Sequence, residues 1–236
     1  MLDFVADPVR PSPLGVGFYT APEVARLLRI PAKNINRWLG GYQFSTGERD
    51  VEMAPLWEPH LPRGEKHLEL SFRDLIELRF VQAFLKAGVS LRTVRHCIQL
   101  ARAATDDDRP FSTRRFKTDG KTIFLESLTG ANDGALLDLR RHQFVIKQVI
   151  ERTFKDLDIE DDAVARWRPF NGKSSIVVDP KRSFGQPVTS RYGVPTIALA
   201  DAVKAEKSEQ RVAYLYNVSP GAVRDAMAFE RSLLAA

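Results

Sequence analysis

Four polar residues of one predicted helix have side-chain types that proteins use to read DNA. Ile35, Trp38 and Leu39 recur at helical spacing, so burying them leaves the opposite face of the helix to polar groups. These groups are Lys33, Asn34, Asn36 and Arg37. Asparagine can form two hydrogen bonds with adenine, arginine can do the same with guanine, and lysine neutralises phosphates. The alternative interpretation is a solvated polar face without a ligand.

A second group of cations surrounds the Asp119-Gly120 pair, which is typical of a two-residue turn between β-strands. The cations are Arg114, Arg115, Lys117 and Lys121. Residues 111–126 are therefore predicted to form a β-hairpin, or wing, whose cations lie along DNA phosphates. Arg92 and Arg95, on the predicted helix before this wing, are expected to extend the strip of positive charge.

The sequence lacks the residue patterns of common catalytic and metal sites. It contains no phosphate-binding G-x-x-x-x-G-K-[ST], no esterase G-x-S-x-G and no zinc-binding H-E-x-x-H. His60 and His67 lie in a proline-rich segment without cysteine partners, and Cys97 is the single cysteine. The acidic runs at 106–108 and 160–162 are interpreted as solvated turns. We expect no enzyme activity, cofactor or metal, with a nuclease that uses these carboxylates as the third-ranked alternative.

The composition is that of a globular protein that can have a nucleic-acid partner. The 236 residues are 44% hydrophobic and 28% charged, and the formal net charge is +5. No apolar run is long enough for a membrane span, and no basic-then-apolar leader is seen at the N-terminus. Together with the single cysteine, these features favour a cytoplasmic protein that does not act on membranes.

The elements that must position the DNA-reading residues begin after an N-terminal arm. Residues 1–17 are rich in proline and glycine and are predicted to be flexible. Thr20 and Glu23 have the spacing of a helix capping box, which predicts a helix over 21–28 and a tight turn before the DNA-reading helix. Two short helices joined in this way are typical of a helix-turn-helix. Residues 42–67 are predicted to be a long irregular loop, anchored by Leu56 and Trp57.

The remaining elements are predicted from caps and apolar periodicity. Ser71 with Asp74 starts a buried helix that ends at Gly88, and Ser90 starts another that runs to about Ala104. Beyond the predicted wing we expect a turn at 130–134, an amphipathic helix over 136–152 and a short hairpin over 154–167. Three short helices from residue 197 onward give a second pattern similar to a helix-turn-helix.

These elements predict a mainly α fold. A winged helix-turn-helix domain is joined by a helix and a short β-hairpin to a small C-terminal helical domain that is also like a helix-turn-helix. The expected divisions are a flexible arm at 1–17, the winged domain at 18–130, the linking helix and hairpin at 131–170 and the C-terminal domain at 171–236.

Two segments of the sequence resemble known families. Residues 19–28 (YTAPEVARLL) with Trp38-Leu39 resemble the first helices of MerR-like winged helix-turn-helix domains, and residues 70–79, 86–91 and 118–125 look like the rest of such a domain. Residues 178–180, 183–188, 193–196 and 216–219 resemble the domain-of-unknown-function family numbered four-three-three. Two departures are the long segment between Gly40 and Leu70 and the lack of metal-binding cysteines or a drug-binding domain after the wing.

The combined resemblance is to the larger VapB-type antitoxins of VapBC-like modules. It implies a non-enzymatic protein that neutralises a cognate PIN-like ribonuclease and regulates its own operon by binding double-stranded operator DNA. The competing interpretation is a stand-alone winged helix-turn-helix regulator without a toxin partner. A homodimer is expected because two half-sites double the DNA contacts. Helix 136–152 is either its dimer element or a helix packed within the chain.

The residues expected to carry these functions fall into two sets. The DNA-binding set is Thr20, Lys33, Asn34, Asn36, Arg37, Arg92, Arg95, Arg114, Arg115, Lys117 and Lys121. The resemblance implies a toxin-binding surface within 171–236. Phe184, Arg191, Tyr192 and Tyr214 are chosen there because aromatic and arginine side chains are frequent interface anchors, although each could instead belong to the core.

Overall fold

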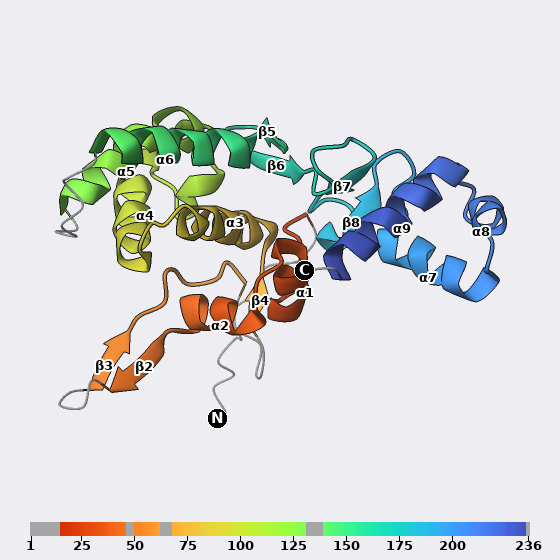
Figure 1. The fold of residues 1–236 in the computed structure, drawn as a ribbon, viewed down its shortest axis with the longest axis horizontal. Helices are drawn as coiled ribbons and strands as arrows, with labels where there is room; N and C mark the ends of the chain where they lie inside the picture. The colour runs from red at the N-terminus through yellow and green to blue at the C-terminus, as the bar shows by residue number, and fades with distance from the viewer. Residues whose placement is uncertain (1–14, 46–49, 62–67, 131–138, 235–236) are drawn as a thin grey trace, which may run out of the picture.

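The chain folds into two helical units joined by a small sheet, as Figure 1 shows for the computed structural model. The structure describes residues 15–45, 50–61, 68–130 and 139–234. We call helices α1 to α6 the N-terminal unit and helices α7 to α9 the C-terminal unit. The two units lie at opposite ends of the long axis, with α8 farthest from the N-terminal unit. Most of the expected arm, residues 1–14, lies outside the described residues.

The first two helices form where the capping and apolar signals predict them. Helix α1 (Ala21–Leu28) starts at a capping box, in which the Thr20 hydroxyl accepts from the Glu23 amide and the Glu23 carboxylate accepts from the Thr20 amide. Helix α2 (Ala32–Gly40) follows after a left-handed residue at Arg29. The apolar side chains of both helices are buried, which confirms the predicted helix-turn-helix.

Two longer helices follow and also confirm the prediction. Helix α3 (Phe72–Lys86) begins at the Ser71 cap and is buried on nearly every side. Helix α4 (Leu91–Thr105) begins at the Ser90 cap. Between them Gly88 has a φ of +86°, which is favourable only for glycine, so the chain can reverse direction there.

The predicted wing at 111–126 is wrong. A short 3₁₀ helix, η1 (Pro110–Ser112), leads into helix α5 (Arg114–Gly130), and the Asp119-Gly120 pair lies inside that helix. Phe116, Ile123 and Phe124 are all buried at helical spacing. Gly120 is close to the Phe116 ring and to Ile150, and a Cβ atom at Gly120 would lie 3.1–3.2 Å from them. Close helix packing thus overrides the local turn preference of Asp-Gly.

Helix α6 (Leu139–Phe154) runs along the side of the molecule opposite α2 in Figure 1. Its buried residues Ile146, Ile150 and Phe154 belong to the core of the N-terminal unit, where α6 packs on α3 and α5. The apolar stripe could have been a dimer element or a face packed within the chain. Ile146, Ile150 and Phe154 pack within the chain. Of the turn expected at 130–134, Gly130 is instead the last residue of α5, and residues 131–134 lie outside the described residues, as do 136–138 at the start of the predicted helix.

The segment predicted as an irregular loop contains a β-hairpin. Strands β2 (Tyr42–Ser45) and β3 (Asp50–Met53) pair antiparallel, from Tyr42 opposite Met53 to Ser45 opposite Asp50. A second short pair joins β1 (Tyr19–Thr20) to β4 (Glu69–Leu70) and sets the start of α1 beside the start of α3. The two anchors expected in this segment, Leu56 and Trp57, are buried as predicted.

A four-stranded antiparallel sheet links the two units. Strands β5 (Leu157–Glu160) and β6 (Ala163–Trp167) form the hairpin predicted at 154–167. Strand β6 also pairs with β7 (Ile176–Val178), and β7 pairs with β8 (Pro187–Thr189). The sheet therefore crosses residue 170, where the sequence suggested a division between domains.

The C-terminal unit contains the three predicted helices, α7 (Thr196–Glu206), α8 (Glu209–Leu215) and α9 (Pro220–Leu234). They enclose a small separate core that includes Leu199, Val212 and Val223. Helix α9 contributes to both cores, because Phe229 and Leu233 pack into the main core of the N-terminal unit. One helix thus connects the interiors of the two units.

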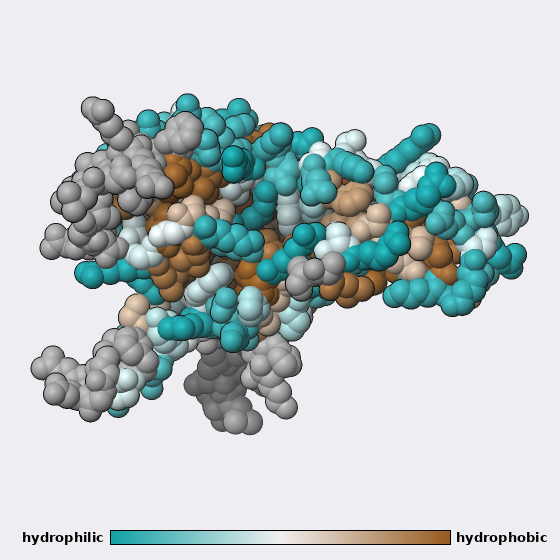
Figure 2. All heavy atoms as spheres, viewed as in Figure 1, coloured by the Kyte–Doolittle hydropathy of each residue, from teal (hydrophilic) through white to brown (hydrophobic). Residues whose placement is uncertain are grey.

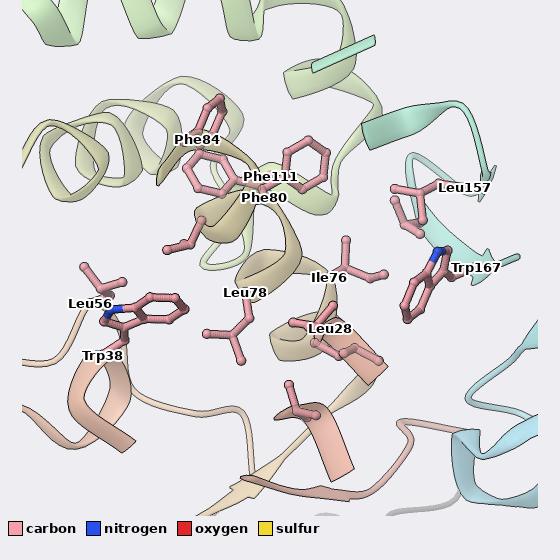
Figure 3. Packing of buried hydrophobic residues seen from close by; sticks show 14 of the residues in the cluster. Leu28, Trp38, Leu56, Ile76, Leu78, Phe80, Phe84, Phe111, Leu157 and Trp167 are labelled. Carbon is pink, nitrogen blue, oxygen red and sulfur yellow. The ribbon is translucent and has the colours of Figure 1, made fainter. Parts of the chain in front are cut away.

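Aromatic side chains fill the centre of the N-terminal unit. The Phe80 ring lies 5.8 Å from Phe111 and 4.9 Å from Phe154, and Phe84 lies 5.5 Å from Phe111. Figure 3 shows Phe80, Phe84 and Phe111 together at the centre, with Trp38 beside Leu56 at the edge next to α2. The helix-turn-helix therefore packs against the same core as the longer helices.

A buried carboxylate, Asp74, organises the loops around the start of α3. Its Oδ1 accepts from the Trp57 indole at 2.9 Å and from the Arg109 guanidinium at 2.7 Å. Its Oδ2 accepts from the amides of Ser71 and His60 at 2.9 Å and 3.1 Å. Because a buried charge is tolerated only when it is paired and hydrogen-bonded, these donors must stay in place.

A second buried carboxylate, Glu77, lies one turn further along α3. It accepts hydrogen bonds from the amides of Phe111 and Ser112 at 3.2 Å and 2.8 Å, which orients η1. Burial raises the pKa of Glu77 to about 7, although Arg73 and the two amides act in the opposite direction. Glu77 therefore changes charge near neutral pH in the folded protein.

The junction between the two units is closed by polar contacts. The Tyr19 hydroxyl donates to the Gly185 carbonyl at 2.7 Å, in the 3₁₀ helix η3 (Ser183–Gly185). On α9, the buried Glu230 carboxylate accepts from Arg26 of α1 at 2.6 Å and from Thr196 of α7 at 2.5 Å. These bonds hold the C-terminal unit against the first helix of the helix-turn-helix.

Replacing Glu77 with glutamine should remove part of the pH dependence of stability. In the unfolded chain Glu77 loses its proton near its ordinary pKa of 4.5, but in the folded protein it does so near 7. The folded state therefore binds more protons between these values, and the free energy of unfolding should fall as pH rises, by about 3 kcal/mol over the window. Urea unfolding at several pH values, with the exposed Glu151→Gln as control, measures the slope. Equal slopes in wild type and Glu77→Gln would contradict this assignment.

Gly185 and Gly88 offer a matched test of the junction. Both have φ near +85°, but a Cβ at Gly185 would overlap the Tyr19 hydroxyl, whereas nothing lies within 4 Å of a Cβ at Gly88. We expect Gly88→Ala to cost about 1 kcal/mol for its backbone conformation and Gly185→Ala about 3 kcal/mol, since it adds overpacking. Urea unfolding measures both. Equal losses would show that the Tyr19 contact does not constrain the fold.

Candidate nucleic-acid interface

Helix α2 presents a narrow polar face to solvent. Ile35, Trp38 and Leu39 are buried against the core, as predicted. Lys33, Asn36 and Arg37 are exposed, and their spacing of i, i+3 and i+4 places them side by side on one face, while Asn34 is half-buried at its margin. Figure 2 shows hydrophilic residues over this part of the molecule. The structure thus brings together three of the four residues predicted on this helix.

The turn before α2 fixes the direction in which this face points. Arg29 adopts a left-handed conformation, and the Ile30 amide donates to the Ala25 carbonyl at 3.0 Å. The Gln82 side chain on α3 donates to the Leu28 carbonyl at 2.8 Å and so holds the end of α1. Helix α2 is therefore placed by the turn and by the long buried helix behind it.

The β2–β3 hairpin projects from the molecule directly after α2 (Figure 1). Gly41 makes the bend between α2 and the hairpin, with a φ of +73°. A Cβ atom added at this position would lie only 2.8 Å from the Met53 carbonyl oxygen, so glycine is needed there. At the base of the hairpin, Arg95 of α4 donates to the carbonyls of Ala54 and Pro55, both at 2.8 Å. The hairpin is thus braced against the N-terminal unit at its base.

A stacking contact joins the hairpin to the polar face of α2. The Arg37 guanidinium carbon lies 3.8 Å from the centre of the Tyr42 ring on β2. Arginine placed over an aromatic ring in this way is attracted by the electrons of the ring. The exposed side chains of β3 include the acidic Asp50 and Glu52, so within the described parts of α2 and the hairpin the positive charge comes from the helix.

The cations predicted for the wing lie elsewhere. Arg114, Arg115, Lys117 and Lys121 are exposed on α5, which Figure 1 shows on the far side of α3 from α2 and the hairpin. Arg114 forms an ion pair with Asp162 at 2.9 Å, and Arg115 pairs with Asp119 at 3.8 Å. They do not form one strip with Lys33 and Arg37.

Three further residues expected to bind DNA have different positions. Thr20 caps α1, and its hydroxyl also bonds the Glu23 carboxylate at 2.8 Å. Arg95 is occupied at the base of the hairpin by its bonds to backbone carbonyls. Arg92 is exposed near the start of α4, one turn before Arg95 on that helix.

Tyr42 and the β2–β3 hairpin were not predicted from the sequence. The signal was present, because both YQFS at 42–45 and DVEM at 50–53 alternate apolar and polar residues, as strands do. The proline-rich segment that follows obscured it. Alternation over four residues is a weak signal in a long segment that otherwise lacks periodicity.

The residues chosen as toxin contacts do not form one surface. Phe184 is exposed at the junction between the units, where its carbonyl accepts from the Phe18 amide at 2.9 Å. Tyr214 is 84% exposed on α8, at the far end of the molecule. Hydrogen bonds from Ser219, before α9, lower the pKa of the Tyr192 phenol. Arg191 lies with its guanidinium carbon 5.5 Å from the centre of the Tyr192 ring.

Among the described residues, neither a metal site nor a membrane span is found. They contain no group of three or more histidine, cysteine, aspartate or glutamate side chains placed to hold a metal ion. No helix among them is long and apolar enough to cross a membrane. Burial raises the pKa of the Cys97 thiol far above its ordinary value, so this cysteine is not a reactive thiolate.

Part of the N-terminal unit matches a known family of helix-turn-helix domains. Residues 17–98, from before α1 into α4, match the family described as "Putative DNA-binding HTH domain". That range contains the helix-turn-helix, the β2–β3 hairpin and α3, but ends before α5. The N-terminal unit therefore carries a helix-turn-helix domain, and the cations of α5 lie outside it.

One curated protein and one solved structure, both from Mycobacterium tuberculosis, are similar to this chain over most of its length. One, from strain ATCC 25618 / H37Rv, is named "Putative antitoxin VapB45"; it is 28% identical over 225 residues, which cover 90% of this chain and 93% of the relative. The other is the crystal structure of Rv2018, which matches with a TM-score of 0.70 and 24% identity, over 91% of this chain and 99% of that chain. The similarity to that structure supports the fold across both units.

Proposed function

We propose that this protein is a non-enzymatic, DNA-binding antitoxin that represses its own operon. The observation that carries the DNA-binding part is the exposed face of α2, where Lys33, Asn36 and Arg37 lie side by side within the range that matches a DNA-binding family. The antitoxin part is supported by the similarity, over most of both chains, to a protein named as an antitoxin.

In this proposal α2 enters the major groove of operator DNA. Asn36 is a suitable partner for adenine, and Lys33 for a phosphate at the edge of the groove. The β2–β3 hairpin acts as the wing, because it follows α2 directly and is braced by Arg95. The acidic Asp50 and Glu52 on β3 favour a role in positioning rather than in neutralising phosphate.

A homodimer fits this mode of binding. A single α2 reads few base pairs, whereas two copies whose helices lie about 34 Å apart would read both halves of a palindrome. The stripe of Ile146 and Ile150 is used within the chain, so we propose that the two copies meet through another surface.

Alanine substitutions on α2 should weaken DNA binding, whereas alanine substitutions on α5 should not. We expect Lys33→Ala to lower affinity for all sequences and to reduce the slope of log affinity against log salt by about 1, as loss of one phosphate contact would. Asn36→Ala should relax preference at one base pair, at a cost of about 1–3 kcal/mol. Electrophoretic mobility shifts with the protein's own promoter, between 50 and 200 mM salt, measure both effects.

The matched control for this experiment is Lys117→Ala with Lys121→Ala on α5. Both residues are exposed cations, as Lys33 is, but they lie outside the matched family range. If the α5 pair weakened binding more than Lys33→Ala did, the DNA interface would lie on α5 and the proposal for α2 would be wrong.

We further propose that the C-terminal unit binds the toxin, a PIN-like ribonuclease. Ion pairs join many of its exposed charges, including Arg211 with Glu206 at 2.8 Å and Lys204 with Asp201 at 2.8 Å. Such a surface attracts phosphates weakly. Its exposed Tyr214, Leu215 and Tyr216 are instead side chains suited to a protein interface.

Capture of the tagged full-length protein from its host tests the toxin partner. We expect a small ribonuclease to co-purify in near-equal amount and its RNA cleavage to be inhibited by the protein. Tyr214→Ala should weaken that inhibition by about tenfold or more, as loss of an interface anchor does. Phe184→Ala, at the unit junction, is the comparison variant. Recovery of the protein alone, still bound to its promoter, would favour a stand-alone regulator.

A further inference from the structure

The contact between Arg37 and Tyr42 has a geometry that bears on how DNA sequence is read. The guanidinium lies over the ring at 3.8 Å, while the Arg37 side chain as a whole remains exposed on α2. Within the described part of the chain, the Arg37 guanidinium has no hydrogen bond or ion pair. Stacking occupies one face of the guanidinium plane and leaves the N–H donors along its edge available.

The ring that supports Arg37 is itself held in place. Gly41 bends the chain so that Tyr42 starts β2 opposite Met53 at the base of the hairpin. Two residues beyond β3, Pro55 accepts from Arg95 at 2.8 Å, and the Leu56 amide donates to the Trp38 carbonyl at 2.7 Å. The segment after β3 is thus fixed to α4 at Pro55 and to α2 at Leu56. Strand β2, which carries the ring, is held by its pairing with β3.

Holding a guanidinium in place favours binding most when the position and plane of the acceptor are also fixed. A free arginine side chain loses rotamer freedom when it is ordered, and a stacked one loses less on binding. A phosphate can be reached from many directions, so it gains little from a pre-set donor. The O6 and N7 atoms of guanine form a planar pair of acceptors in the major groove, which matches the fixed edge of Arg37.

We propose that Tyr42 is a positioning residue that holds Arg37 to read a guanine in the major groove. Arg37 would donate two hydrogen bonds to one guanine, beside the base contacted by Asn36, and Tyr42 would not touch that guanine. The inference rests on the proposed DNA-binding function of α2 and deepens it, since it names the base and the residue that sets the geometry.

The test uses the full-length protein and selection of binding sites from random double-stranded DNA. Wild type should select a motif with one guanine whose replacement by adenine weakens binding by about tenfold or more. Arg37→Lys keeps the charge but cannot form the paired hydrogen bonds, and it should abolish this discrimination while retaining affinity for DNA in general. Arg37 is exposed, so this variant is expected to fold normally.

The variants of Tyr42 separate positioning from stability. Tyr42→Phe keeps the ring and should keep the discrimination, whereas Tyr42→Leu should lower it by about twofold to fivefold. The double variant Arg37→Lys with Tyr42→Leu should lose no more discrimination than Arg37→Lys alone, because the two changes affect the same interaction with guanine. Thermal unfolding of each variant shows whether the fold is kept, and Tyr42→Phe against wild type stays informative if Tyr42→Leu unfolds.

Each outcome decides a separate question. If Arg37→Lys keeps the full preference for guanine, or weakens all sequences equally, Arg37 does not read a base and the inference is overturned. If Tyr42→Leu folds and discriminates as well as wild type, or Tyr42→Phe loses discrimination, Tyr42 does not position Arg37 by stacking. If wild type binds none of the random DNA, the proposed function itself fails, before any variant is compared.

Discussion

The paired burial of Asp74 and Arg109 is the constraint on which the arrangement of the N-terminal unit depends. Arg109 is 7% exposed, and its guanidinium bonds both Asp74 and the Glu58 carbonyl. Breaking such a pair leaves an uncompensated buried charge, which costs about 3–5 kcal/mol. Because Asp74 also holds Trp57, the return segment after the β2–β3 hairpin is tied to the start of α3. The position of the hairpin beside α2 thus follows from a carboxylate in the core.

A buried ion pair also links the two units. Glu230 is buried on α9 and is neutralised by Arg26 of α1, so the C-terminal unit cannot leave the helix-turn-helix without exposing or unpairing a charge. Helix α9 also contributes apolar residues to both cores. A partner bound near α8 would therefore act on a helix whose other end touches the proposed DNA-reading domain. In the proposed function, α9 would therefore link toxin binding to repression physically.

Local signals in the sequence predicted most helices, because caps and apolar spacing are read over a few residues. Thr20 with Glu23 and Ser71 with Asp74 each start the helix expected of them. The Asp119-Gly120 pair led to a wrong prediction of a hairpin. Its preference for a turn is overridden because Phe116 and Ile150 pack against Gly120, and this packing depends on the tertiary structure. The polar face of α2 was predicted for the same local reasons. Its stacking partner Tyr42 was not, because that contact depends on the hairpin and on Arg95, more than fifty residues away.

Site-specific cross-linking to promoter DNA is the most direct measurement of where the protein contacts nucleic acid. A photoreactive amino acid at position 36 samples the polar face of α2, and one at position 117 samples the cationic face of α5. If α2 reads the major groove, position 36 should cross-link to bases at a defined place in the promoter, and position 117 should give little product. Strong cross-linking from position 117 with none from position 36 would contradict the DNA-binding role assigned to the helix-turn-helix.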